Sequence, residues 1–263
     1  TKFGENYTLK DVQKWKVKKG DKMEEQFKQL AIAYVSGELT EKAIEDGLKQ
    51  ISRMLDYNYN VDFDARHIVG DNPGDFKDVD YGCNRVEGPD AGHGTHVSGI
   101  ICATRGNGIG NDGVADNVQI MALRAVPNGD ERDKDIALSI RYAVDNGAKI
   151  INMSFGKSYS QYPDEVYEAM KYASDNDVLL VHAAGNDSKN IDQEPNFPKS
   201  NYDGKGEIAL LMTVGASTRF LKADMEEGNA LAAGFTNYGD KSIDIFAPGH
   251  AIYSTTPGDK YEK

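Results

Sequence analysis

The sequence contains few cysteines, no long apolar run and too few basic residues to balance its acidic ones. Two cysteines in 263 residues, Cys83 and Cys102, cannot make a disulfide framework or a four-ligand zinc site, so we expect free thiols unless an oxidising compartment joins them. None of the apolar stretches approaches the roughly 20 residues that span a bilayer, so no membrane span is expected. The net charge of −12 repels phosphate groups and makes nucleic acid a poor candidate partner.

What is present is a globular composition, with 39% hydrophobic and 27% charged residues. The first 60 residues differ from the rest, because apolar residues recur there at helical spacing, first as far as Tyr34 and then from Ile44 to Leu55. A break at residues 36–37 separates the two stretches. We predict an inserted helical hairpin over residues 1–60 and a core over residues 61–263, together forming one domain.

Residues 60–92 are rich in Asp, Gly, Asn and Pro, which predicts a long surface loop. Hard cations prefer oxygen ligands, so its carboxylates could bind a structural calcium ion. The carboxylates in question are those of Asp71, Asp75, Asp78 and Asp80. Their spacing does not match the EF-hand pattern, and turn chemistry is the favoured interpretation. We expect no other metal or cofactor.

Beyond Gly92, strand and helix patterns alternate. Continuous apolar runs predict strands at 118–126, 149–154, 178–184, 208–214 and 243–247, and helical spacing predicts helices at 133–146 and 163–176. Strands without in–out alternation are typical of a parallel sheet that is buried on both faces. The sequence therefore predicts a three-layer α/β fold, with a mostly parallel sheet and helices on both of its faces.

The sharpest local motif places a histidine where a loop passes into a helix, with glycines at 92 and 94 around it. The motif reads Asp90-Ala91-Gly92-His93-Gly94-Thr95-His96-Val97-Ser98-Gly99. The two glycines allow another chain to approach closely. Taken alone, a histidine is more often structural than catalytic. A metal pair of His93 and His96 would lack both the glutamate and the i, i+4 spacing of a helical zinc motif.

Two predicted strand ends carry a second pattern, because ligands bind at the carboxyl ends of parallel strands. The two ends read Asn152-Met153-Ser154-Phe155-Gly156 and His182-Ala183-Ala184-Gly185-Asn186. Small residues at 183–185 leave room beside the backbone. Asn186 offers the neutral N–H donor that a developing oxyanion requires. The alternative is that Gly185-Asn186 is only a turn.

In this order, these segments resemble the subtilase family of serine peptidases. The resemblance covers the chain from Asp90 onward. It is carried by His93–Gly99, Ile151–Gly156, Ala183–Asn186 and Ile245-Phe246-Ala247-Pro248-Gly249. It implies a subtilisin-like fold and a serine endopeptidase that cleaves extended polypeptides through an acyl-enzyme. It also implies a bacterial-type protein that is exported to the periplasm, the cell surface or the medium.

The resemblance implies a role for each matching residue. His93 is the general base, and Asn186 donates a hydrogen bond to the oxyanion. Ser154, Phe155 and Gly156 pair with the substrate main chain, and Ala183, Ala184 and Gly185 form one wall of the primary specificity pocket. His96 matches a position that packs inside the helix, and no chemistry is assigned to it.

Two motifs of the family are missing from the 263 residues. No serine lies in a Gly-Thr-Ser-Met-Ala-like stretch, and Ser254 belongs to the segment that precedes it. No Asp-Ser/Thr-Gly triplet supplies the triad aspartate. We therefore expect a domain truncated at both ends that is inactive alone, exposes apolar surface and self-associates. The alternatives to truncation are a naturally inactive relative and an unusual nucleophile. The alternative function is a non-catalytic peptide-binding module.

Overall fold

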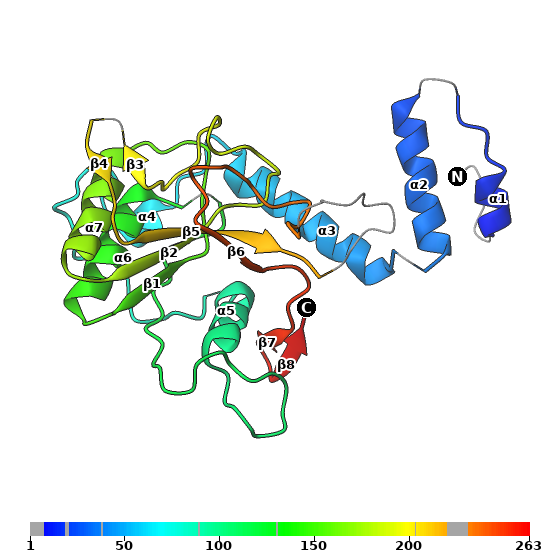
Figure 1. Ribbon diagram of the computed structural model, residues 1–263. Coiled ribbons are helices and arrows are strands. Elements are labelled where there is room, and N and C mark those ends of the chain that lie inside the picture. The colour runs from blue at the N-terminus through cyan, green and yellow to red at the C-terminus, as the bar shows by residue number, and fades with distance from the viewer. Residues whose placement is uncertain are drawn as a thin grey trace. The chain divides into compact units, whose positions relative to one another are not determined.

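The computed structural model describes residues 8–18, 21–37, 39–88, 90–129, 131–202, 204–219 and 231–263 (Figure 1). The chain divides into two compact units, Thr1–Phe63 and Asp64–Lys263. Among the helices of the described residues, none is long and apolar enough to cross a membrane.

The first unit is helical. Its elements are α1 (Leu9–Gln13), α2 (Lys22–Val35), α3 (Glu41–Arg53) and the π-helical turn η1 (Met54–Asn58). The Asp21 carboxylate caps α2 by accepting a hydrogen bond from the Glu24 backbone N–H at 3.0 Å. The apolar faces of both long helices are exposed, with Phe27 at 58% and Leu48 at 60%. Both predicted helices are therefore present, whereas their packing into a hairpin stays a prediction.

The second unit is built on a four-stranded parallel sheet in the order β1-β2-β5-β6. Its helices are α4 (Arg66–Val69), α5 (Gly92–Cys102), α6 (Asp133–Asp145) and α7 (Pro163–Asp175). Its strands are β1 (Ile150–Met153), β2 (Leu179–Ala183), β3 (Asn201–Tyr202), β4 (Gly206–Glu207), β5 (Leu211–Ser217), β6 (Ile245–Pro248), β7 (Ser254–Thr256) and β8 (Lys260–Glu262). The predicted parallel sheet is confirmed.

The main core lies between the sheet and the helices α6 and α7 (Figure 1). Met153 on β1 and Leu180 on β2 are almost completely buried there, as are Ile140 on α6 and Met170 on α7. Burial of each such side chain contributes about 1.5–3 kcal/mol. A one-residue slip of a strand would turn its apolar side chains to the opposite face, so this burial fixes the register. The register in turn fixes which residues reach the carboxyl edge of the sheet.

One predicted strand is wrong. The apolar run 118–126 predicts a buried strand, but in the described part of the chain it pairs with no other strand. Val118 is 46% exposed and Met121 is 41% exposed. A strand needs a partner for its N–H and C=O groups, and an apolar composition does not supply one. A smaller difference is that β5 begins at Leu211, three residues after the predicted start.

Candidate active site

Two of the predicted site segments meet at the carboxyl edge of the sheet. β1 and β2 pair in parallel, with Met153 opposite His182, so Ser154–Gly156 and Ala183–Gly185 leave the sheet side by side. The structure therefore brings together the six residues predicted to bind substrate. Ala184 is only 1% exposed, so a group that approached this edge would meet its two partly exposed neighbours instead of its side chain.

A buried histidine joins the two segments. His182 is 1% exposed, and its Nε2 lies 2.9 Å from the Phe155 carbonyl oxygen. A carbonyl only accepts, so we assign the proton to Nε2; Nδ1 then has no partner among the described residues. Burial lowers the pKa of His182 to about 4, and the hydrogen bond to Phe155 opposes that effect only in part. This link is therefore uncharged at neutral pH.

Asn186 lies in the loop that follows β2, and its side chain is exposed. Gly185 before it has a φ of +101°, in the left-handed region that glycine adopts readily. The Ser188 backbone N–H donates to the Phe235 carbonyl at 3.0 Å, and the Ser188 hydroxyl donates to the Gly234 carbonyl at 2.8 Å. The loop is thus bonded to the chain around residue 235, and it presents an amide at the carboxyl edge.

His93 lies in the first turn of α5 and is exposed. Among the described residues, no hydrogen bond or ion pair is found for the His93 side chain, and none joins it to Asn186. The helix itself is anchored by β7, because the Thr255 hydroxyl donates to the Thr95 carbonyl at 2.9 Å. Gly99 allows this contact, since a Cβ at that position would lie 2.1 Å from the Thr255 hydroxyl oxygen.

Two other residues of this region have structural hydrogen bonds. His96 Nε2 lies 3.1 Å from the Ile252 carbonyl oxygen. Ser254 is completely buried, and its hydroxyl donates to the His96 carbonyl at 2.8 Å. The Ser254 hydroxyl is therefore engaged in holding β7 to α5.

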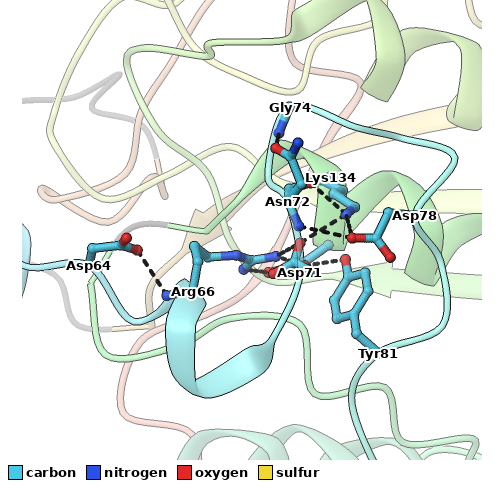
Figure 2. A network of polar contacts seen from close by, with 9 residues as sticks. Asp64, Arg66, Asp71, Asn72, Gly74, Asp78, Tyr81 and Lys134 are labelled. Carbon is cyan, nitrogen blue, oxygen red and sulfur yellow. Dashed lines mark hydrogen bonds and ion pairs between the residues drawn. The ribbon is translucent and has the colours of Figure 1, made fainter.

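The segment 64–81, part of the loop that is rich in acidic residues, is bound to α6 by a network of charged side chains (Figure 2). Arg66 pairs with Asp71 and reaches both carboxylate oxygens of Asp135, at 2.8 and 3.1 Å. Lys134 Nζ lies 2.8 Å from Asp71, and the Tyr81 hydroxyl donates to Asp135 at 2.5 Å. Burial raises the pKa of the Asp71 carboxyl, but hydrogen bonds from Arg66 and Lys134 outweigh burial and hold that pKa below its usual value.

These contacts show what the acidic residues of the segment do. Asp75 accepts a hydrogen bond from the Lys77 backbone N–H at 2.9 Å, which confirms the predicted turn chemistry at that position. Asp71 is instead a buried partner of two cations, and that role was not predicted. No three His, Cys, Asp or Glu side chains gather as metal ligands in the described residues.

Sequence reasoning also missed two buried polar residues at the candidate site. His182 reads only as part of a strand end, and Asn237 belongs to none of the motifs of the sequence. Both are almost completely buried, and both hydrogen-bond to the loops of the carboxyl edge. No spacing rule would have found them, because their partners lie 27 and 53 residues away in the sequence.

Comparison with known proteins identifies the family. The sequence profile of the Subtilase family, peptidase S8, matches residues 44–263. The thermophilic serine proteinase of Bacillus sp. (strain AK1) is 34% identical over 208 residues, which are 79% of this chain and 44% of that protein. The cell wall-associated protease of Bacillus subtilis (strain 168) is 40% identical over 169 residues, 64% of this chain and 16% of that protein. The chain thus spans less than half the length of these relatives.

Solved structures show the same fold. The S41 psychrophilic protease aligns with a TM-score of 0.55 at 29% identity, covering 70% of this chain and 60% of that one. The epidermin leader peptide processing serine protease of Staphylococcus aureus aligns with a TM-score of 0.51 at 23% identity over 65% of this chain and 47% of its own, which supports the fold alone. The predicted three-layer α/β, subtilisin-like fold is confirmed, and the chain belongs to the Subtilase family.

Proposed function

We propose that the protein is a serine endopeptidase to which this chain contributes the general base and one oxyanion donor. The observation that carries the proposal is the shared carboxyl edge of β1 and β2, where Ser154–Gly156 follow one strand and the exposed Asn186 lies in the loop that follows the other. Membership of the Subtilase family supports it. The substrate class that fits is a polypeptide in extended conformation.

Each residue has a defined step in the proposed reaction. His93 takes the proton of a serine hydroxyl as that oxygen attacks the peptide carbonyl, and later returns it to the leaving amine. The side-chain N–H of Asn186 donates to the oxyanion that forms. The Phe155 carbonyl is bonded inward to His182, so pairing with the substrate main chain falls to Ser154 and Gly156.

The nucleophile and the triad aspartate do not come from a family motif within these 263 residues. Without the aspartate, the tautomer of His93 has no partner to fix it. Without the serine, there is no group to acylate. We propose that the 263-residue chain alone does not turn over substrate. Export from the cell is a further proposal, supported by the name of the cell wall-associated relative.

A serine-directed phosphonate tests this function. We expect it to leave the 263-residue chain unlabelled and to label the natural gene product that contains these residues, which should also cleave a peptide substrate. In that gene product, His93→Ala should abolish labelling and cleavage. The exposed histidine of α4 provides the matched control, and His67→Ala should change neither.

A second variant tests the oxyanion donor. Asn186→Ala should lower kcat by roughly 10²–10³, the cost known for one such donor in subtilisin. Full cleavage by the His93→Ala variant would overturn the proposed function. Peptide binding without any cleavage by the gene product would instead establish a peptide-binding module.

A further inference from the structure

Residues 184–189, which form the loop that carries Asn186, are held in place by the side chain of Asn237. This side chain is buried, with 0% of the residue exposed. Its Nδ2 donates to the Ala184 carbonyl at 2.8 Å. Its Oδ1 accepts hydrogen bonds from the backbone N–H groups of Asp187 at 2.9 Å and Lys189 at 3.0 Å. One amide side chain thus satisfies three backbone groups of a loop that lies about 50 residues earlier in the sequence.

These bonds lie on both sides of Asn186. The carbonyl of residue 184 is bonded before it, and the N–H groups of residues 187 and 189 are bonded after it. The backbone N–H of Asn237 also donates to the Gly185 carbonyl at 2.9 Å. The backbone of the loop is therefore fixed by a buried group, while the side chain of Asn186 is exposed.

Gly185 fits closely against this amide. A Cβ at position 185 would lie 2.4 Å from Asn237 Nδ2, and the φ of the residue is +101°. Backbone conformation and close packing both require glycine here. The small residue before Asn186 and the buried amide of Asn237 therefore form one unit, in which neither can change without displacing the other.

Asn237 is itself anchored to the sheet. The hydroxyl of Thr236 accepts a hydrogen bond from the Ala216 backbone N–H on β5 at 2.9 Å. After Asn237, the chain turns around the Asp192 carboxylate, which accepts hydrogen bonds from the Asp240 N–H at 2.7 Å and the Ser242 N–H at 2.9 Å. Asn237 and its hydrogen bonds to the loop, which we call the brace, are thus connected to β5 of the main sheet.

We infer that Asn237 is a positioning residue that sets the direction of the Asn186 amide toward the oxyanion. The inference rests on the proposed function. A donor stabilises a transition state only when its N–H is already aimed at the oxygen on which charge develops. Asn237 supplies this alignment without touching the substrate. It does so with a neutral group, which adds no charge beside the developing oxyanion.

The kinetic test uses the natural gene product that contains this chain. Asn237→Ala removes all three side-chain bonds, and we expect kcat to fall about 10- to 100-fold with KM within about twofold, because a displacement near 1 Å has effects of that size. Rates are normalised by active-site titration, so unfolded molecules do not count. Asn237→Ser, with a hydroxyl in place of the amide, is the second variant if the alanine variant does not fold.

Asn196 provides the matched control. Its Nδ2 reaches the same Ala184 carbonyl at 3.3 Å, but it bonds neither Asp187 nor Lys189. Asn196→Ala should leave kcat within about twofold of the wild type. Combining Asn237→Ala with Asn186→Ala should cost no more than Asn186→Ala alone. Independent, multiplicative losses would show that Asn237 does not act through Asn186, and unchanged kcat in Asn237→Ala would overturn the inference.

Hydrogen exchange separates this inference from the proposed function. The amides of Asp187 and Lys189 should exchange faster in Asn237→Ala than in the wild type, and at the wild-type rate in Asn196→Ala. Unchanged protection at both amides would refute the brace even in an active enzyme. If the gene product cleaves no peptide, the proposed function fails, and with it the catalytic role of Asn237; faster exchange would then leave a structural brace only.

Discussion

Two surface segments of the second unit are fixed to the same core by opposite chemistry. The segment 64–81 is held by formal charges, with Arg66 and Lys134 against Asp71 and Asp135 (Figure 2). The loop 184–189 is held by a neutral amide, that of Asn237. Both anchors are buried, so burial alone does not explain why one is charged and the other is not.

The difference matches what each segment has to do. A charged network tolerates burial when every charge has an opposite partner, and Asp71 has two. Beside a candidate oxyanion site, the same charges would change the local potential at the point where negative charge develops. A neutral amide fixes the backbone and adds no charge of its own there.

Loss of one cation from the charged network should have the largest effect. Arg66→Ala leaves the buried carboxylate of Asp71 with Lys134 as its remaining ion-pair partner and deprives Asp135 of its bidentate pair. We expect the free energy of unfolding, measured with urea, to fall by about 3–5 kcal/mol.

The control for Arg66→Ala removes an exposed ion pair. Lys171 pairs with Asp175 on the surface of α7, where solvent screens the pair, so Lys171→Ala should leave the free energy of unfolding almost unchanged. Equal losses in the two variants would show that the network of segment 64–81 is no stronger than a surface pair.

The free energy of unfolding should depend on pH through the protonation of His182. Its pKa of about 4 in the fold lies below the ordinary value of 6.5, so between these values the unfolded chain binds a proton that the fold does not. The contribution of neutral His182 to the free energy of unfolding is fully present above pH 6.5. As the pH falls, this contribution decreases, by about 3 kcal/mol at pH 4.

The variant His182→Gln isolates this contribution. It retains a side-chain N–H that can donate to the Phe155 carbonyl but does not titrate. The loss of unfolding free energy between pH 7 and pH 4, followed by urea titration, should be smaller in this variant than in the wild type. Identical curves would place the titration elsewhere.

A charge introduced into the neutral brace should have a smaller effect with the opposite pH slope. Asn237→Asp is nearly isosteric, but at pH 7 it turns the donor to the Ala184 carbonyl into a charged acceptor. Burial raises the pKa of such a carboxyl, so the cost, about 2 kcal/mol at pH 7, should shrink as the pH falls and the carboxyl gains a proton. Urea unfolding relative to the wild type measures it. A pH-independent difference would argue against a buried charge at this position, and Asn196→Asp should cost less because that residue is partly exposed.

The smallest effect should come from the hydroxyl contacts between β7 and α5. Thr255→Val keeps the shape of the side chain but removes the bond to the Thr95 carbonyl, which should lower the unfolding free energy by about 1 kcal/mol. Thr104 is exposed, and Thr104→Val should change stability by less than about 0.5 kcal/mol. A loss as large as that of Arg66→Ala would mean that neutral contacts anchor segments as strongly as charges.

The predictions from sequence succeeded where a pattern is local. The apolar spacing between Asp133 and Asn146 predicts α6 to within a residue, and the run that ends at Ala184 predicts β2. Helical spacing and a short apolar run can both be recognised from residues that are close together in the sequence. The segment 118–126 has the same kind of apolar run, yet it pairs with no strand in the described residues. Strand formation requires a partner that composition does not identify.

The amino-acid pattern was enough to predict the parallel α/β arrangement, the family and the motif residues His93 and Asn186, because these depend on periodicity and on short ordered motifs. The tertiary structure alone decided that Asp71 would meet Lys134 and that Asn237 would brace the loop before and after Asn186. A buried amide or carboxylate bonds to whichever groups the fold brings beside it. Those groups lie about 50 to 60 residues away along the chain, where no local pattern records them.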